Sequence, residues 1–573
     1  MLDHSLFNLL AIRTCILALR YTPVLEAALL IACLFFSRNS NHPLLSQITI
    51  YVLVGLLTLE ATYYLLFYRR HKDRLSESRA QHPAPLTPSA RRALFERCVA
   101  NVPDWDRYLR LWFLLGSNST NSSSPGNDLD RIKRDNVREF LLWGFFDGTD
   151  SASEEEETEL QGYLARVESL SGRKFAPGRG SANPLRLTID EVITCYRSVV
   201  WYAIVAFIDL VTYLSLSVWH GFDHYKPAPT TFTQHSCSSA PASVSVFPPR
   251  LHLQTLKSPS SSIGYWYRPH VSRTKLPILF IHGIGVGLWP YTKFLGELDA
   301  DNEIGIIALE IMPMSTRLTH PPLAQADFLR EVGQIWSAHG QDWERFVLVS
   351  HSYGSVLSTH ILRSADLGPR VRGLVLIDPV SILLHLPDVA YNFTRRAPKT
   401  ANEWQLWYFA SMDMGVAEGL GRHFFWRENI IWREELVRLD CKEKEEEVGD
   451  HNAQRRRLRN GKQLRSDKGR KVAVCLSGRD LIVDTRTVAR YLASDVDFAD
   501  LRRQGGNEVD DMFGNETTCT VGSRLNPALE IMWFPQLDHA QVFDSAKDRA
   551  RVVEKIRRFC LEAVGDEEEV ALN

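Results

Sequence analysis

The sequence lacks the features that mark several common classes of protein. Its 573 residues include 66 basic and 68 acidic side chains, and a net charge of -2 gives no basic excess that would favour nucleic acid as a partner. Its 9 cysteines form no CxxC pair and no Cys/His cluster with zinc-ligand spacing, so we predict neither a metal site nor a cofactor. The start, MLDHSLFNLL, has no basic n-region and no small-residue cleavage site, which argues against a cleaved secretory signal.

What the sequence does have is two long apolar runs near its start. Thr14–Phe36 contains only two charged residues, and Ile48–Tyr68 contains only Glu60. Each is close to the roughly 20 residues that a helix needs to cross a bilayer. We therefore predict a membrane anchor over residues 1–75 with two transmembrane helices, although core helices of a soluble domain would also be apolar. The basic run RRHKDR follows the second helix directly and favours the cytoplasmic side for that end.

Residues 76–225 form a helical and polar region that ends in a third apolar segment, 199–219. PSARRALFERCVANV and NVREFLLWGFF have the spacing of helices, and SASEEEETE is typical of a solvated acidic run. Asp209 lies in the middle of the third segment, where a charge inside a bilayer would be costly. The segment could span the membrane, lie in its interface or pack on the rest of the chain, and the sequence leaves these three open. If it spans, the C-terminal half lies on the opposite side from RRHKDR.

A Pro/Ser/Thr-rich linker is expected over residues 226–250, and the pattern changes after it. Across 251–573, continuous apolar runs alternate with segments of helical length, which indicates a parallel sheet covered on both faces. Two low-complexity segments, 441–470 and 502–518, interrupt this domain and are expected to be disordered surface insertions. The seven runs that we expect to be strands are IGYWYRPH, LPILFIHG, IGIIALEI, FVLVSHS, GLVLIDP, KVAVCLSG and ALEIMWFP.

The stretch VSHSYGS places Ser352 at the corner between an apolar strand and a helical run. A sharp strand-to-helix turn lifts a nucleophilic serine out of a sheet, and small residues two before and two after it allow the close approach. Gly354 fits the usual G-x-S-x-G pattern, whereas Ser350 replaces its first glycine. A hydrolytic serine also needs a base, an acid that orients the base, and donors for the developing oxyanion.

Candidates for these partners follow other predicted strands, in the chain order Ser, Asp, His. Asp480 follows KVAVCLSG, and His539 follows ALEIMWFP. Upstream, the glycine-rich HGIG would let the N–H of Ile284 act beside the N–H of Tyr353 as an oxyanion hole.

These motifs, FIHGIG, VSHSYGS, LIDPVSILLHLPDVAYNFT, SGRDLIVD and LDHAQVF, resemble the α/β-hydrolase superfamily over about residues 246–573. More narrowly, the chain is similar to membrane-associated fungal proteins that carry an α/β-hydrolase domain. The resemblance implies an α/β fold, with a mostly parallel eight-stranded sheet, helices on both faces and a helical lid, here 381–439. It also implies Ser352 as nucleophile, Asp480 as acid and His539 as base.

The identity of the acid stays open, because Asp484 lies four residues beyond Asp480 and Asp378 ends the strand LIDP, where some relatives hold it. We expect His282 to hold its loop by hydrogen bonds and His351 to pack beside the corner, without a chemical role.

The predicted activity is hydrolysis of a lipid or lipophilic ester through an acyl-enzyme, since the lid is crowded with aromatic side chains and the anchor places the enzyme on membrane lipids. Two alternatives remain. The pattern H-x-x-x-x-D, His539 to Asp544, occurs in some acyltransferases, and a membrane scaffold could use an inactive hydrolase fold. The sequence indicates neither the substrate-binding residues nor the oligomeric state.

Overall fold

The structure is a computed structural model that describes most of the chain. The residues described are 5–37, 43–115, 128–146, 152–227, 248, 250, 254–299, 302–340, 343–438, 469–494, 498, 518–522 and 528–571. Most of the predicted linker 226–250, nearly all of the insertion 441–470 and most of the insertion 502–518 lie outside the described residues.

One mixed sheet organises the C-terminal half, which we call the sheet domain (223–571). Its order is β2-β1-β3-β5-β4-β6-β7-β8-β10-β9. The central strands β5, β4, β6, β7, β8 and β10 are parallel, whereas β3 and β9 pair antiparallel with their inner neighbours. The strands are β1 (Asp223–Lys226), β2 (Leu256–Lys257), β3 (Gly264–Arg268), β4 (Ile278–Ile281), β5 (Ile306–Glu310), β6 (Phe346–His351), β7 (Val371–Ile377), β8 (Lys471–Ser477), β9 (Cys519–Gly522) and β10 (Leu529–Phe534).

All seven predicted strands are confirmed, but the predicted number of eight is wrong, because the described residues form a sheet of ten. The additional strands are short and lie at or near the sheet's edges. β2 has 2 residues and β9 has 4, too few to give a pattern of side chains in the sequence.

Helices cover both faces of the sheet, as the alternation of side chains along its strands requires. In β4, Leu279 and Ile281 face one core, whereas Ile278 and Phe280 face the other. The first core includes α11 (Gln325–Ala338), α12 (Gly354–Arg363) and α19 (Thr485–Ala493), and the second includes α10 (Thr292–Glu297) and α21 (Ala546–Ala571).

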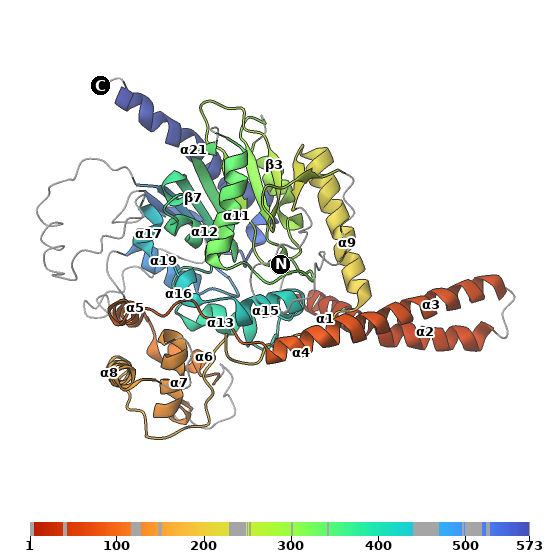
Figure 1. The fold of residues 1–573 in the computed structure, drawn as a ribbon, viewed down its shortest axis with the longest axis horizontal. Coiled ribbons are helices and arrows are strands. Elements are labelled where there is room, and N and C mark those ends of the chain that lie inside the picture. The colour runs from red at the N-terminus through yellow and green to blue at the C-terminus, as the bar shows by residue number, and fades with distance from the viewer. Residues whose placement is uncertain are drawn as a thin grey trace, which may run out of the picture.

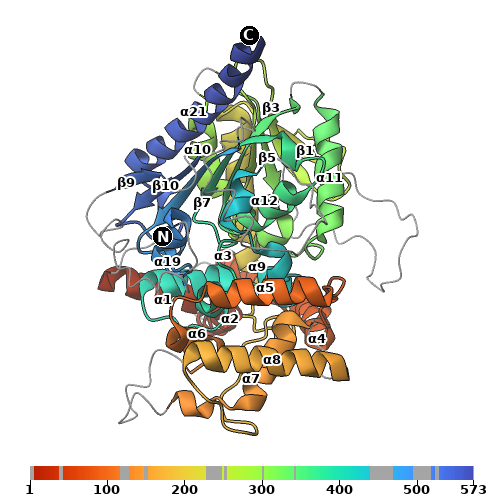
Figure 2. The same ribbon diagram turned by 90° about the vertical axis from the view of Figure 1, so that its left-hand side faces the viewer.

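The lid lies between β7 and β8 and separates the sheet domain from a helical subdomain (78–195). Figure 2 shows these three layers stacked, with the helical subdomain at the bottom. The lid contains α13 (Pro387–Thr394), α14 (Ala401–Leu406), η8 (Trp407–Ser411), α15 (Met414–Arg422), α16 (Trp426–Asn429) and α17 (Arg433–Val437). The helical subdomain contains α5 (Pro88–Ala100), α6 (Trp105–Trp112), α7 (Arg134–Phe145) and α8 (Glu154–Ser171). One continuous apolar core joins all three layers.

The helical subdomain confirms two predicted helices and corrects one segment. PSARRALFERCVANV and NVREFLLWGFF form α5 and α7. The acidic run SASEEEETE is not simply solvated, because it begins α8, where the Ser153 side chain caps the helix and four glutamates occupy the first turn. Glu159 from this run is buried and accepts hydrogen bonds from Arg91 Nε (3.3 Å) and Nη2 (2.6 Å).

The first apolar run, predicted as one helix over Thr14–Phe36, is two helices. α1 (Leu6–Arg20) and α2 (Thr22–Ser37) meet at a bend of 71° at Tyr21. Pro23 explains the bend, because proline has no N–H and fits the first turn of a new helix but not the middle of a continuous one. The second run is continuous from α3 (Pro43–Tyr63) through η1 (Tyr64–Tyr68) to the basic α4 (Arg69–Glu77). Figure 1 shows α2 and α3 side by side, projecting from the body.

The third apolar segment packs on the sheet domain. It forms α9 (Val199–Leu214) and η3 (Ser215–Trp219), and Figure 1 shows α9 along the side of the sheet domain, across the direction of the α2/α3 hairpin. Asp209 is buried and bonded to Arg317, which donates from Nε (3.0 Å) and from Nη2. Thus the charge at the middle of this helix points into protein, and its partner comes from the loop after β5.

Candidate active site

Ser352 occupies the tight turn between β6 and α12. Its φ is +51°, a left-handed backbone conformation that residues other than glycine adopt at a cost of order 1–3 kcal/mol. Its N–H donates to Ile377 O (2.9 Å) at the end of β7, which holds the turn in place. Gly354 permits the close crossing of strand and helix, since a Cβ there would lie 2.5 Å from the carbonyl oxygen of Ile281.

Ser350, where the usual pattern has glycine, is accommodated by a partner. Its side chain is fully buried, and its Oγ lies 2.8 Å from Oγ of Ser358, one turn into α12. The hydroxymethyl group therefore fits the crossing without an unpaired polar atom, and the turn geometry is kept.

The structure brings together the three residues predicted as the catalytic set. His539 follows β10, and its Nε2 lies 2.9 Å from Ser352 Oγ. Its Nδ1 lies 2.7 Å from Oδ2 of Asp480, which follows β8. The other carboxylate oxygen of Asp480 accepts hydrogen bonds from the N–H groups of Ile482 (2.7 Å) and Val483 (2.9 Å), so the acid is held in one orientation.

The other two candidate acids have different partners. Asp484 caps the N-terminus of α19 by accepting from the Thr487 N–H (3.2 Å) and hydroxyl (2.9 Å). Asp378, at the end of β7, accepts from the N–H groups of Ser477 (3.0 Å) and Ala540 (2.9 Å). Asp480 is thus the carboxylate bonded to the His539 ring, while Asp378 joins the two loops that carry Asp480 and His539. Both nitrogens of His539 are engaged, so Asp544 is not its partner.

Charge in this buried cluster favours the protonated imidazole. Burial alone lowers the pKa of His539, but the charge and hydrogen bond of Asp480, with smaller contributions from Asp378 and Asp538, raise it to about 9. Burial raises the pKa of Asp378 to about 6, with His539 opposing this and Asp480 adding to it. Asp378, Asp480 and His539 place three potential ligand atoms within 4.8 Å of one another, but all three side chains already have hydrogen-bond partners within the protein.

The glycine-rich loop after β4 lies against the Ser352 turn. A Cβ at Gly283 would lie 2.9 Å from Ser352 Cβ, so only glycine allows this approach. His282 holds the loop through Nδ1 to Gly283 O (2.7 Å) and through Nε2, which accepts from the Ile311 N–H (2.9 Å). Burial lowers the pKa of His282 to about 4, and the neutral ring satisfies both bonds. Its predicted structural role is confirmed.

The two residues predicted to form the oxyanion hole lie at the pocket of Ser352. Ile284 and Tyr353 line the same pocket as Ser352, and among the described residues neither N–H donates to another protein group. His351 packs beside this turn as expected, with Nδ1 2.8 Å from the Tyr291 hydroxyl and its ring centroid 5.2 Å from that of His539.

The pocket above Ser352 is small and almost wholly apolar. Its volume is about 50 Å³, which is room for a few water molecules at about 10–15 Å³ each. Half of its lining residues belong to the lid, and Trp112 of α6 and Trp143 of α7 also line it. Sequence reasoning missed these two tryptophans, since nothing in their local pattern places the helical subdomain over a serine more than 200 residues away. The lining residues are Trp112, Trp143, Leu187, Ile284, Ser352, Tyr353, Val380, Leu384, Val389, Ala390, Phe393, Thr394, Leu420, Phe424, Trp426 and Ile482.

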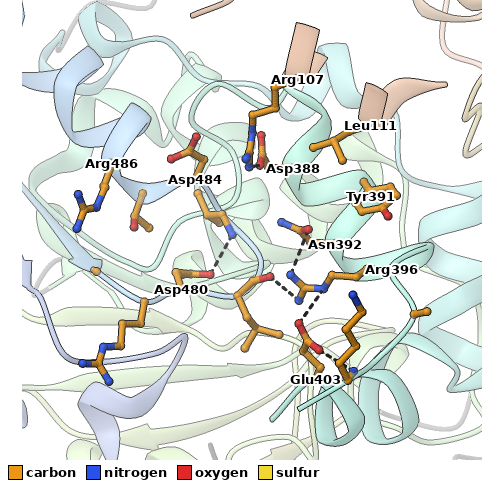
Figure 3. A pocket seen from close by; sticks show the side chains of 17 residues that line it. Arg107, Leu111, Asp388, Tyr391, Asn392, Arg396, Glu403, Asp480, Asp484 and Arg486 are labelled. Carbon is orange, nitrogen blue, oxygen red and sulfur yellow. Dashed lines mark hydrogen bonds and ion pairs between the residues drawn. The ribbon is translucent and has the colours of Figure 1, made fainter. Parts of the chain in front are cut away.

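A larger polar cleft of about 570 Å³ lies on the other side of the wall formed by α6, α13 and the loop after β8. Figure 3 shows two charged pairs in this cleft, with Arg107 beside Asp388 and Arg396 pointing toward Glu403. Arg107 bonds to Asp388, and Arg396 donates to the Leu481 carbonyl (2.7 Å) and lies 3.5 Å from Glu403. These mutual pairings brace the wall that carries Asp480.

Part of this chain is similar to a known family of proteins. The model of the alpha/beta hydrolase family matches residues 278–510. Over these residues the chain is similar to that family. None of the curated proteins matches the chain.

Solved structures similar to this chain include three hydrolases. A Bacillus subtilis carboxylesterase is 10% identical, with 62% of this chain and 98% of that one covered and a TM-score of 0.32. A membrane phospholipase A described as a bacterial virulence factor is 13% identical, with coverages of 64% and 95% and a TM-score of 0.30. A Pyrococcus furiosus esterase is 10% identical, with coverages of 52% and 88% and a TM-score of 0.29.

Proposed function

We propose that this chain is a membrane-associated serine hydrolase that cleaves a lipid or lipophilic ester through Ser352, His539 and Asp480. The observation that carries the proposal is the unbroken hydrogen-bonded chain from the Ser352 hydroxyl through both nitrogens of His539 to Asp480, at 2.9 and 2.7 Å. A serine in a strained turn, a bonded imidazole and an oriented carboxylate form the arrangement that nucleophilic hydrolysis requires.

The reaction follows from this geometry. His539 Nε2 accepts the hydroxyl proton as Ser352 Oγ attacks the ester carbonyl, and Asp480 stabilises the imidazolium. The N–H groups of Ile284 and Tyr353 would donate to the oxyanion. Collapse of the tetrahedral intermediate expels the alcohol, which takes the proton from His539. Water then attacks the acyl-enzyme by the same proton transfers and releases the acid.

The apolar pocket supports an ester with a hydrophobic acyl group. Its walls offer an acyl chain almost only hydrocarbon and aromatic side chains, but the described volume of about 50 Å³ requires the lid to move before a chain enters.

Two helices long and apolar enough to cross a membrane, Gln47–Glu77 and Val199–Trp219, and the bent pair α1/α2 support the membrane association. The resemblance to membrane-associated fungal proteins is part of the same proposal.

An activity-based fluorophosphonate probe on the purified full-length chain tests the nucleophile. We expect the probe to label the wild type and Ser381→Ala but not Ser352→Ala, and ester hydrolysis to fall by roughly 10⁴-fold or more in Ser352→Ala. Ser381 is a matched control, because it is also buried and its hydroxyl has no partner among the described residues. No labelling of the folded wild type would instead indicate a scaffold, and faster acyl transfer to a lysophospholipid than to water would indicate an acyltransferase.

A further inference from the structure

Exposed apolar side chains are concentrated on a few helices of this protein. Most of the large apolar side chains that are more than a third exposed belong to α1, α2, α3, η1 and the α9/η3 segment. Of the hairpin, α3 continues into a helix long and apolar enough to cross a membrane, and the shorter apolar α2, which passes that test only together with α1, lies beside it. In contrast, α1 and α9 point in other directions. The environment of the exposed apolar faces of α1 and α9 therefore does not follow from that of the hairpin.

The two faces of α9 differ sharply. One face is fixed to the sheet domain by the buried pair of Asp209 and Arg317 and by Tyr213, whose hydroxyl accepts from the Gln254 N–H (2.9 Å). The opposite face presents Phe207, 65% exposed, and Val218, 68% exposed. The buried face of the first half of α9 packs against Tyr63, Tyr68 and Met414, and that of the second half is bonded to the sheet domain. Because its buried face is thus held by the rest of the protein, α9 could cross a bilayer only if those parts entered the bilayer with it.

The neighbouring elements indicate how the hairpin meets this surface. The basic helix α4 continues from α3 at the base of the hairpin, and His71 Nε2 lies 3.0 Å from Glu418 of the lid helix α15. The body and the basic segment are therefore on the same side of any membrane that the hairpin enters. In α3, Glu60 accepts from the Val199 N–H (2.8 Å), which joins the hairpin to the start of α9. The apolar face of α9 is thus continuous with the hairpin.

We propose that α9 and α1 lie in the interface of the membrane that holds the α2/α3 hairpin, with the exposed face of α9 against lipid. The sheet domain and lid then lie on the side of α4, and the chain crosses only through the hairpin. This inference rests on the membrane association in the proposed function and deepens it. Since α1 packs against Tyr408 and Met412 of the lid region, the lid is adjacent to the bilayer, and the substrate would be an ester already dissolved in lipid.

Depth measurements on α9 test this arrangement. A fluorescent amino acid replaces Ile204, which is 38% exposed, Phe207 or Val218 in the full-length protein in vesicles of phosphatidylcholine and phosphatidylserine. Quenching is then compared for lipids brominated at different depths. Positions 204 and 218 are separated by about 21 Å along a helix. An interfacial helix places all three positions at one shallow depth, roughly 5–10 Å inside the headgroup boundary. Val271, which is 66% exposed and lies just after β3, is the matched control and should not be quenched.

Two results would overturn the proposal. Depths that change steadily from 204 to 218 and pass the bilayer centre would show a spanning helix. Equal absence of quenching at positions 204, 207, 218 and 271 would show that water or another protein covers α9. The measurement does not depend on turnover and should give the same depths in Ser352→Ala. A shallow α9 in a protein without ester hydrolysis would therefore contradict the proposed reaction but leave this arrangement intact.

Discussion

Asp378 illustrates how a single buried residue can organise a site without contacting its reactive atoms. Its two carboxylate oxygens accept from the N–H groups of Ser477 and Ala540, so it joins the end of β8 to the loop of His539. It also adds negative charge beside His539. We therefore regard Asp378 as a positioning residue that also sets the pKa of the imidazole.

The pH dependence of hydrolysis tests this role. His539 must be neutral to accept the serine proton, and its pKa is about 9, so kcat/KM should rise with pH through an alkaline limb. Asp378, with a pKa of about 6, is ionised there. In Asp378→Asn the loss of this negative charge lowers the pKa of His539, and the limb should move to lower pH by roughly one unit.

Asp484→Asn is the matched control for that experiment. It makes the same chemical change at the cap of α19, where asparagine is also a good N-cap residue, and should leave the limb unchanged. A limb that stays in place in Asp378→Asn, or moves equally in both variants, would contradict the electrostatic role.

At the scale of elements, the position of α7 explains how the helical subdomain takes part in the site. Trp143 is held by a hydrogen bond from its Nε1 to the Thr188 hydroxyl (2.8 Å), and its ring lines the pocket beside Ser352. The helical subdomain is therefore a second cover over the site in addition to the lid, and the size of this side chain limits the space for an acyl group.

Replacing Trp143 with leucine should enlarge the pocket. We expect the ratio of kcat/KM for long-chain over short-chain esters to rise by roughly tenfold in Trp143→Leu, a change typical of a methylene or more gained in an apolar pocket. Trp105→Leu is the control, because Trp105 is a buried tryptophan of the same subdomain that does not line the pocket. The assignment is wrong if a panel of chain-length esters gives the same ratio for both variants.

The elements also show what local sequence can predict. The strands β4, β5, β6, β7, β8 and β10 were predictable because a buried parallel strand must be apolar throughout, and the antiparallel β3 was predictable because most of its residues are buried as well. β1 could not be predicted, because DHYK has no apolar run. It becomes a strand by pairing with β3, which follows the linker in the sequence. The bend at Tyr21 could have been predicted from the proline two residues later in the sequence. A count of apolar residues alone does not take this proline into account.

For the whole molecule, the decisive contacts join residues that are far apart in the sequence. Order and spacing could predict that Ser352, Asp480 and His539 belong together, but they could not select among three acids, because that choice depends on where each carboxylate points. Likewise the sequence shows Asp209 only as a charge in an apolar segment. Its role as the partner of a buried arginine is seen only when the structure places Arg317 beside it. The lid similarly contacts α1, which lies at the opposite end of the chain from the His539 loop.

The contact between α1 and the lid predicts that the N-terminus stabilises the lid. Ile16 is 4% exposed and packs in the cluster with Tyr408 and Met412, whereas its neighbour Leu17 is 55% exposed. Truncating a buried isoleucine to alanine typically costs 2–5 kcal/mol. If Ile16→Ala costs about 2 kcal/mol and exchange occurs through local opening, amide hydrogen exchange in Ala401–Met412 should be roughly 30-fold faster. The exchange rates of β6 and β7 should not change.

Leu17→Ala removes a similar side chain from the other face of the same helix and should leave lid exchange at the wild-type rate. Mass spectrometry of the exchanged full-length protein in detergent resolves these segments. Equal exchange of the lid in both variants would show that α1 does not support it. Faster exchange in the lid alone in Ile16→Ala would show that α1 controls how often the lid over Ser352 opens, because lid helices must separate before an acyl chain can enter.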